Sequence, residues 1–178
     1  MCMKQILFWR HAETNLNQEG RFCGRMDVDI TEEGKKQAEK MRETFKKYHF
    51  DAIYCSPLKR TKQTMEAIFP NRKFIKEDGF TEISLGDWEG LKKETISQKL
   101  RKAFQRGEYA PPHGEKHEDV EARVKEAIER IFATYPDGSV ILVCTSNGIM
   151  RTIKRIYGIK TEKMMSGNLE FFSLKREA

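Results

Sequence analysis

An arginine and a histidine follow an apolar run near the start of the chain, and both side chains could act on a phosphate group. Residues 6–9 are apolar and predict a buried strand, which Arg10 and His11 follow directly. In an open α/β sheet, ligands bind beyond the carboxyl ends of the strands. The guanidinium of Arg10 suits phosphate, and a neutral imidazole at His11 can attack a phosphorus atom. The pair by itself would also fit an ordinary surface position.

Two serines follow other predicted strands. Ser56 follows a short apolar strand, and Ser146 comes soon after the strand predicted over 139–143. The carboxyl ends of parallel strands meet at the same edge of a sheet. We therefore expect Arg10, His11, Ser56 and Ser146 to share one crevice.

Strands and helices alternate along the chain, which predicts an α/β fold: a three-layer sandwich with a mostly parallel central sheet and helices on both faces. Thr31 is a candidate N-cap for the first long helix. An apolar stripe marks the helix over 117–135, and the run 139–143 fits a central strand covered on both faces. The predicted strands are 4–9, 52–55, 73–75, 139–143 and 169–174, and the predicted helices are 31–47, 57–69, 93–106, 117–135 and 147–157.

Composition indicates one globular domain over residues 1–178, with 38% hydrophobic and 34% charged residues. The net charge is +6, but acidic and basic residues are interleaved, which favours solvated helix faces over a nucleic-acid-binding stripe. No apolar run reaches the length of a membrane span, and residues 1–4 lack the features of a signal peptide. We expect a cytoplasmic protein that binds neither membrane nor nucleic acid.

The four cysteines predict neither a zinc site nor a disulfide framework. Cys2, Cys23, Cys55 and Cys144 are far apart and form no Cys-x-x-Cys pair. Cys55 and Cys144 each end an apolar run, so we expect buried thiols. Carboxylates and histidines do not cluster at metal-ligand spacing either, and no metal or other cofactor is implied.

Linked motifs resemble those of the histidine phosphatase superfamily, the clan of phosphoglycerate mutases and related phosphatases. The resemblance covers about residues 5–151 and is nearest to short members such as α-ribazole phosphatase. It implies a phosphoglycerate mutase-like fold and a phosphomonoester hydrolase. The matching segments, in order, are Arg10-His11-Ala12-Glu13-Thr14, Asn17, Gly20-Arg21-Phe22-Cys23-Gly24, 29–34, 56–64, 82–90 and 114–123.

The resemblance assigns roles to single residues. His11 would form a phosphohistidine intermediate, Arg10 and Arg60 would bind the phosphoryl oxygens, and Glu82 would serve as general acid and then as base. The remaining phosphate-binding positions would be Thr14, Asn17, Arg21, Cys23, Gly24 and Asn147. The substrate would be a small phosphorylated compound, and the short stretch between Glu82 and Gly114 favours a phosphomonoesterase over a mutase.

Ser146 departs from the family pattern, which places a second histidine at this position. Serine can donate a hydrogen bond but has no charge, and loss of a pre-organised donor costs about 10²–10³-fold in rate. Three accounts stay open: a working phosphatase that uses Ser146 and Asn147, a binding or interaction module of impaired activity, and an engineered replacement. His113 or His117 reaching into the pocket is a further alternative.

Two other interpretations concern nearby residues. Cys144 and Arg151 resemble the loop of the cysteine-based phosphatases, but six residues separate them where that loop has five. Cations at 92, 93, 101 and 106 could contact a substrate anion, although solvated helix charges are the preferred interpretation. The substrate class is left open between a cobalamin precursor, a sugar phosphate, a nucleotide and a phosphoprotein.

Overall fold

The computed structural model describes residues 3–159 and 171–176, which form a five-stranded sheet with the order β3-β2-β4-β1-β5. Neighbouring strands among β1 to β4 are parallel, and β5 pairs antiparallel with β1. The mostly parallel sheet is therefore confirmed. The strands are β1 (Lys4–Arg10), β2 (Ala52–Cys55), β3 (Ile75–Lys76), β4 (Val140–Thr145) and β5 (Phe171–Arg176).

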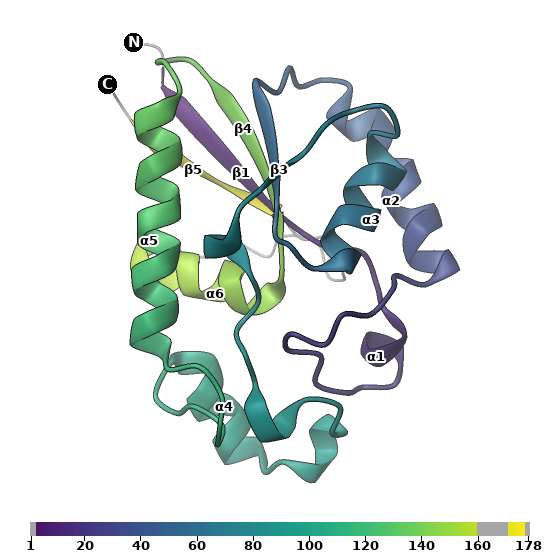
Figure 1. Cartoon of the computed structure of the whole chain (residues 1–178), viewed down its shortest axis with the longest axis vertical. Helices are drawn as coiled ribbons and strands as arrows, with labels where there is room; N and C mark the ends of the chain where they lie inside the picture. Colours follow the sequence, from purple (N-terminus) through teal and green to yellow (C-terminus); the bar gives the residue numbers. More distant parts are fainter. Residues whose placement is uncertain (1–2, 160–170, 177–178) are drawn as a thin grey trace.

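Helices cover both faces of the sheet (Figure 1). One core cluster joins Ile6 and Phe8 of β1 to the apolar faces of α5 and α6, and a second joins Leu7 and Trp9 to α2 and α3. Alternate residues of β1 thus point to opposite faces, as strand geometry requires. The predicted three-layer α/β fold is confirmed. The helices of these layers are α2 (Glu32–Phe45), α3 (Lys59–Ile68), α5 (His117–Thr134) and α6 (Asn147–Ile156).

The register of the central strands brings their carboxyl ends to one edge. Arg10 of β1 pairs with Thr145 of β4, and Cys55 of β2 pairs with Cys144. The backbone N–H of His11 then donates to the Thr145 carbonyl at 3.0 Å. The residues that follow these strands are therefore held at the same level.

A segment between the sheet and α5, which we call the cap (residues 86–109), lies beyond that edge (Figure 1). It contains η2 (Gly86–Trp88), η3 (Lys93–Thr95) and α4 (Gln98–Arg106), and η1 (Asp78–Phe80) precedes it. The Trp88 ring lies 5.1 Å from Phe22, 5.7 Å from Phe104 and 5.6 Å from Tyr109 between ring centroids. This aromatic cluster attaches the cap to the loop after β1.

Several predicted boundaries were wrong for identifiable local reasons. The single helix expected over 93–106 is divided, because Ser97 is extended and accepts from the Leu100 N–H as the N-cap of α4. The helix expected from residue 57 begins two residues later, since Leu58 has an extended backbone. The loop expected over 10–30 contains α1 (Asn15–Gln18). Residues 169–170 of the last predicted strand lie outside the described residues.

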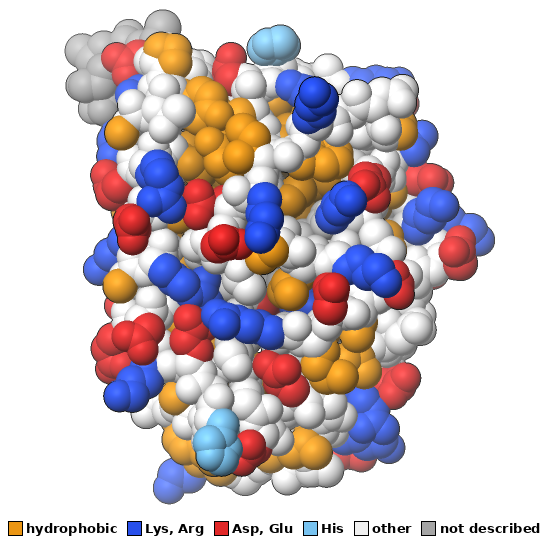
Figure 2. Space-filling model, viewed as in Figure 1, with side chains coloured by type: hydrophobic (Ala, Val, Ile, Leu, Met, Phe, Trp, Pro, Cys, Tyr) orange, Lys and Arg blue, Asp and Glu red, His pale blue; other side chains and the backbone are white. Residues whose placement is uncertain are grey.

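The distribution of charge on the surface agrees with the interleaved acidic and basic residues of the sequence. Figure 2 shows acidic and basic side chains interspersed on one face. Within residues 3–159 and 171–176, we find no helix long and apolar enough to cross a membrane.

Candidate active site

The imidazole of His11 is oriented by the backbone on one side and faces an arginine on the other. Nδ1 lies 2.7 Å from the Ala12 carbonyl oxygen, and Nε2 lies 3.2 Å from Nε of Arg60. A carbonyl only accepts and a guanidinium only donates, so the proton belongs on Nδ1 and the lone pair on Nε2. The side chain is 3% exposed. This tautomer leaves Nε2 as the nucleophilic atom.

The surroundings of His11 keep the ring neutral. Burial lowers its pKa well below the usual 6.5, and the charges of Arg60 and Arg10 lower it further, while the hydrogen bond with Ala12 opposes these effects. Desolvation and like charges both disfavour an imidazolium. The nucleophilic form is therefore the prevailing form at neutral pH.

The pKa of His11 is expected to fall far below that of the exposed His113, whose pKa is raised by its hydrogen bond with Asp87. Between its folded pKa and 6.5, His11 takes up a proton only in the unfolded chain, so its contribution to stability is lost as the pH falls below 6.5. Nuclear magnetic resonance titration of the ring protons checks the order of the two histidines. A His11 pKa equal to or above that of His113 would contradict this picture.

Arg60 connects the first turn of α3 to the loop after β1. It is completely buried, and its guanidinium donates to the carbonyls of Gly24 at 2.7 Å and Met26 at 2.9 Å. Gly24 has a φ of +50°, and a Cβ there would lie 2.2 Å from Oε1 of Glu89, so this position requires glycine. Arg60 is thereby fixed beside His11 in one orientation.

Glu82 lies against the first turn of α6. Its Oε2 accepts from the Gly148 N–H at 3.2 Å, and its Oε1 accepts from the Ile83 N–H at 2.8 Å. A Cβ on Gly148 would lie 2.3 Å from Oε1, which explains why a residue without a side chain stands there. These two backbone contacts fix the carboxyl group of Glu82 at the start of α6.

A second carboxylate holds the loop that carries Glu82. Glu115 accepts from Nε of Arg123 at 2.8 Å and from Nη2 of Arg25 at 2.9 Å. Arg25 also donates from Nε to the Glu82 carbonyl at 3.0 Å. We missed this positioning role of Arg25 from the sequence, because no local pattern joins it to residues 57 and 90 positions away.

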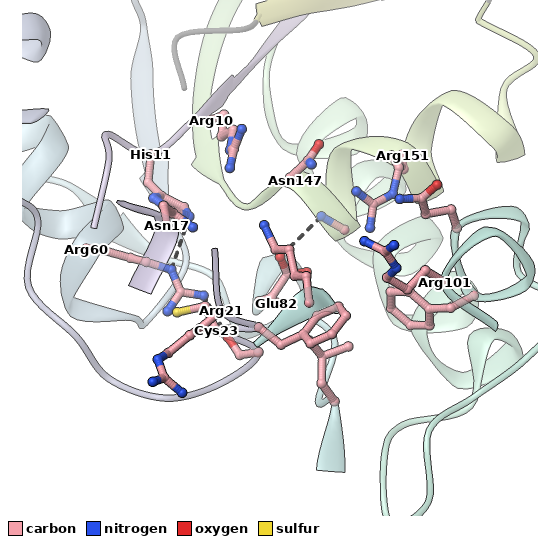
Figure 3. A pocket seen from close by; sticks show the side chains of 17 residues that line it. Arg10, His11, Asn17, Arg21, Cys23, Arg60, Glu82, Arg101, Asn147 and Arg151 are labelled. Atoms are coloured by element: carbon pink, nitrogen blue, oxygen red, sulfur yellow. Dashed lines mark hydrogen bonds between the residues drawn. The ribbon is translucent and has the colours of Figure 1, made fainter. Parts of the chain in front are cut away.

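Nine of the predicted site residues line one pocket of about 190 Å³ (Figure 3). Its charged lining is dominated by Arg and Lys, and Glu82 is the one carboxylate among the described lining residues. The predicted residues that line it are Arg10, His11, Asn17, Arg21, Cys23, Gly24, Arg60, Glu82 and Asn147. The other lining residues are Phe22, Leu85, Lys93, Arg101, Phe104, Gln105, Gly148 and Arg151.

Three predicted residues occupy supporting positions outside this lining. Thr14 is fully buried and caps α1 in a reciprocal pair with Asn17. Ser146 is fully buried behind Arg60, with its Oγ 3.4 Å from Nη2 of that residue. The expectation that Ser56 shares the crevice was wrong, because its hydroxyl is buried and pairs with Thr61 at 3.0 Å.

Neither alternative histidine takes the place of the second family histidine. His113 is exposed and pairs with Asp87 at 2.9 Å. Nε2 of His117 lies 3.0 Å from the Tyr109 carbonyl, and the ring packs 5.2 Å from that of Phe104. Neither residue lines the pocket.

The cysteine-based alternative fails on burial. Cys55 and Cys144 are both buried, as predicted, and burial raises the pKa of Cys144 well above its usual value. A protonated thiol inside the core is a poor nucleophile. Cys23 does line the pocket, but burial raises its pKa as well.

Two of the four cations for which solvated helix charges were preferred line the pocket, and one of them, Lys93, is also exposed. Lys93 and Arg101 belong to the lining, whereas Lys92 and Arg106 form surface ion pairs with neighbouring carboxylates.

Comparison with known proteins agrees with this fold. Residues 6–175 match the model of the histidine phosphatase superfamily (branch 1), and the chain belongs to this superfamily. Phosphoserine phosphatase 1 of Hydrogenobacter thermophilus is 33% identical over 172 residues, which cover 92% of this chain and 81% of that protein.

One further protein is similar to this chain in sequence, and one solved structure is similar to it in fold. A 2,3-bisphosphoglycerate-dependent phosphoglycerate mutase of Bacteroides thetaiotaomicron is 38% identical over 104 residues, 54% of this chain and 42% of that one. The solved structure of a mycobacterial glucosyl-3-phosphoglycerate phosphatase superposes with a TM-score of 0.83, at 23% identity, over 95% of this chain and 91% of that chain. The latter likeness establishes the fold alone.

Proposed function

We propose that the chain hydrolyses small phosphomonoesters through a phosphohistidine intermediate on His11. The observation that carries the proposal is the neutral His11 ring, with its Nε2 lone pair directed into a cationic pocket. Glu82 lines the same pocket and supplies a carboxyl group for proton transfer. The similarity to phosphoserine phosphatase 1 supports the same class of reaction.

In the first step, Nε2 of His11 attacks phosphorus and the ester oxygen–phosphorus bond breaks. Arg10 and Arg60 stabilise the charge on the phosphoryl oxygens, and Glu82 in its acid form gives its proton to the departing oxygen. The Nδ1–H bond to Ala12 holds the ring while it becomes cationic. Nε of Arg60 donates a hydrogen bond to Nε2 in this structure. This N–H must donate to a phosphoryl oxygen instead when substrate binds, so that the Nε2 lone pair is available for attack.

In the second step, water attacks the phosphohistidine. The Glu82 carboxylate takes a proton from that water, the bond between phosphorus and Nε2 breaks, and inorganic phosphate leaves. His11 returns to its neutral form and Glu82 to its acid form. The cycle consumes one water and needs no metal ion.

Ser146 acts in this scheme through Arg60. Its Oγ accepts weakly from the guanidinium at 3.4 Å, so it supports the orientation of that cation. The absence of a cation at position 146 also supports a second candidate, a binding module that retains phosphate affinity with little turnover.

The test is hydrolysis of para-nitrophenyl phosphate in the presence of a metal chelator, together with trapping of the phosphoenzyme under alkaline conditions. We expect turnover and an alkali-stable, acid-labile phosphate located on His11 by peptide mass spectrometry. A phosphate on another residue, or no turnover, would refute the proposal. In the latter case, a gain of activity in Ser146→His identifies an impaired phosphatase, and no gain favours the binding module.

Replacement of Glu82 by glutamine is expected to slow hydrolysis of an alkyl phosphate by about 10²–10⁴-fold, because general acid catalysis is lost. With para-nitrophenyl phosphate the leaving group needs no acid, so the first step is retained and the second is slowed. We therefore expect a burst of nitrophenol and accumulated phosphohistidine. Glu94→Gln, an exposed change in the cap, is the control. Equal losses for both substrates without a burst would assign Glu82 a structural role.

A further inference from the structure

Three cations that the proposed phosphoryl chemistry does not use lie together in the pocket. Figure 3 shows Arg101 and Arg151 on the side away from His11, with Arg10 between the two sides. Arg101 comes from α4 of the cap and Arg151 from α6, while Lys93 begins η3. Separate elements thus bring positive charges to one place.

The pKa of Lys93 indicates how close these charges are. Partial burial of its ammonium group lowers the pKa, and the charges of Arg10, Arg151 and Arg101 lower it further. Lys93 is an exposed residue, and it lines the pocket together with Arg10, Arg101 and Arg151. Gathered like charges repel one another, and a bound anion would relieve that repulsion.

Within the part of the chain that the structure describes, two of these cations have no carboxylate in ion-pair contact that would neutralise their charge. Throughout residues 3–159 and 171–176, the side chains of Lys93 and Arg101 form no ion pair, and Nε of Arg101 is buried without a hydrogen-bond partner. The carboxylate that lines the pocket, Glu82, already accepts from backbone N–H groups. Buried donors of this kind usually have a partner, which here would come from the ligand.

We propose that Lys93, Arg101 and Arg151 form a second anion-binding subsite, so that the preferred substrate is a small phosphomonoester with a further carboxylate or phosphate group. The inference rests on the proposed function, because His11 defines where the reacting phosphoryl group binds. The cavity of about 190 Å³ is smaller than the ~300–1,000 Å³ of common ligand pockets. A cavity of this size suits a compact dianionic metabolite.

The first experiment compares three probes of similar length: propyl phosphate, phosphooxypropanoate and propanediol bisphosphate. The second and third add a carboxylate and a phosphate, respectively, at the far end. We expect kcat/KM for at least one anionic probe to exceed that for propyl phosphate by at least about tenfold, as one charge-assisted hydrogen bond provides. The two anionic probes distinguish a carboxylate subsite from a phosphate subsite. Equal values for all three probes would overturn the inference.

The matched variants are Arg101→Gln and Lys102→Gln, which remove one charge each from adjacent positions of α4. Arg101 lines the pocket, whereas Lys102 is exposed and does not. We expect Arg101→Gln to lower the anionic-to-neutral ratio of kcat/KM by about tenfold, since the loss of a charged partner is worth this much. Lys102→Gln should leave the ratio unchanged. The same fall in both variants would indicate a general field effect and would refute a defined subsite.

Calorimetric binding of the probes to His11→Asn separates this inference from the proposed function. This variant has no nucleophile, so binding is measured without turnover. Tighter binding of an anionic probe, lost on adding Arg101→Gln, supports the subsite even if the parent hydrolyses none of the probes. The opposite result is turnover that depends on His11 but shows no preference for an anionic probe in rate or in binding. That result would support the proposed phosphatase function and overturn the proposed subsite.

Discussion

Replacement of His11 by asparagine is expected to lower kcat/KM for para-nitrophenyl phosphate by at least about 10⁴-fold, because removal of a nucleophile eliminates the covalent pathway. Asparagine retains an N–H donor for the Ala12 carbonyl but cannot accept a phosphoryl group at the position of Nε2. The measurement is steady-state hydrolysis, with the trapped phosphoenzyme quantified in parallel. Both signals should disappear together.

His113→Asn is the matched control for this change. His113 is exposed and has a φ of +56°, a conformation that asparagine tolerates. We expect its activity to remain within about twofold of the parent, as for most surface substitutions. Added imidazole should partly restore turnover in His11→Ala by entering the space of the missing ring. Undiminished hydrolysis in His11→Asn would show that another group is the nucleophile.

Replacement of Arg60 by methionine is expected to lower kcat/KM by about 10³–10⁵-fold, the contribution of an arginine that stabilises a transferring phosphoryl group. A second consequence concerns acid–base behaviour. The charge of Arg60 is the largest cause, after burial, of the low pKa of His11. Its removal should raise the pKa of His11, and the acid limb of the pH–rate profile should move to higher pH.

Stability must be measured beside activity in this variant. Arg60 is completely buried and donates to the Gly24 and Met26 carbonyls, so methionine leaves two acceptors without these donors. Each such loss costs about 1–3 kcal/mol of unfolding free energy. Lys62→Met on the exposed side of α3 is the control, since its partner Glu66 is also at the surface. If Arg60→Met folds and its kcat/KM stays close to that of the parent, Arg60 has no role in the mechanism.

Local patterns predicted the main elements of the fold because their signals lie within each element. Thr31 caps α2 through its side chain, as its residue type and the two following glutamates suggested. The apolar stripe of α5 is buried from Val120 to Phe132. Strand β4 is buried on both faces, in agreement with its continuous apolar composition.

Side-chain direction could not be predicted in the same way. Ser56 follows a strand as His11 does, yet its hydroxyl pairs with Thr61 and does not reach the pocket. Ser146 follows β4 but lies behind Arg60. Position in the chain determines where a residue enters the site, whereas the nearest available hydrogen-bond partner determines where its side chain turns.

The sequence by itself determined the alternation of strands and helices, the placement of Arg10 and His11 at a strand end, and the superfamily resemblance. These depend on residue type and spacing along the chain. The tertiary structure decided which His11 nitrogen holds the proton and how far its pKa falls. It also brought Lys93 and Arg101 to the pocket. Burial and charge–charge interactions depend on distances between residues far apart in sequence, and only the folded chain establishes those distances.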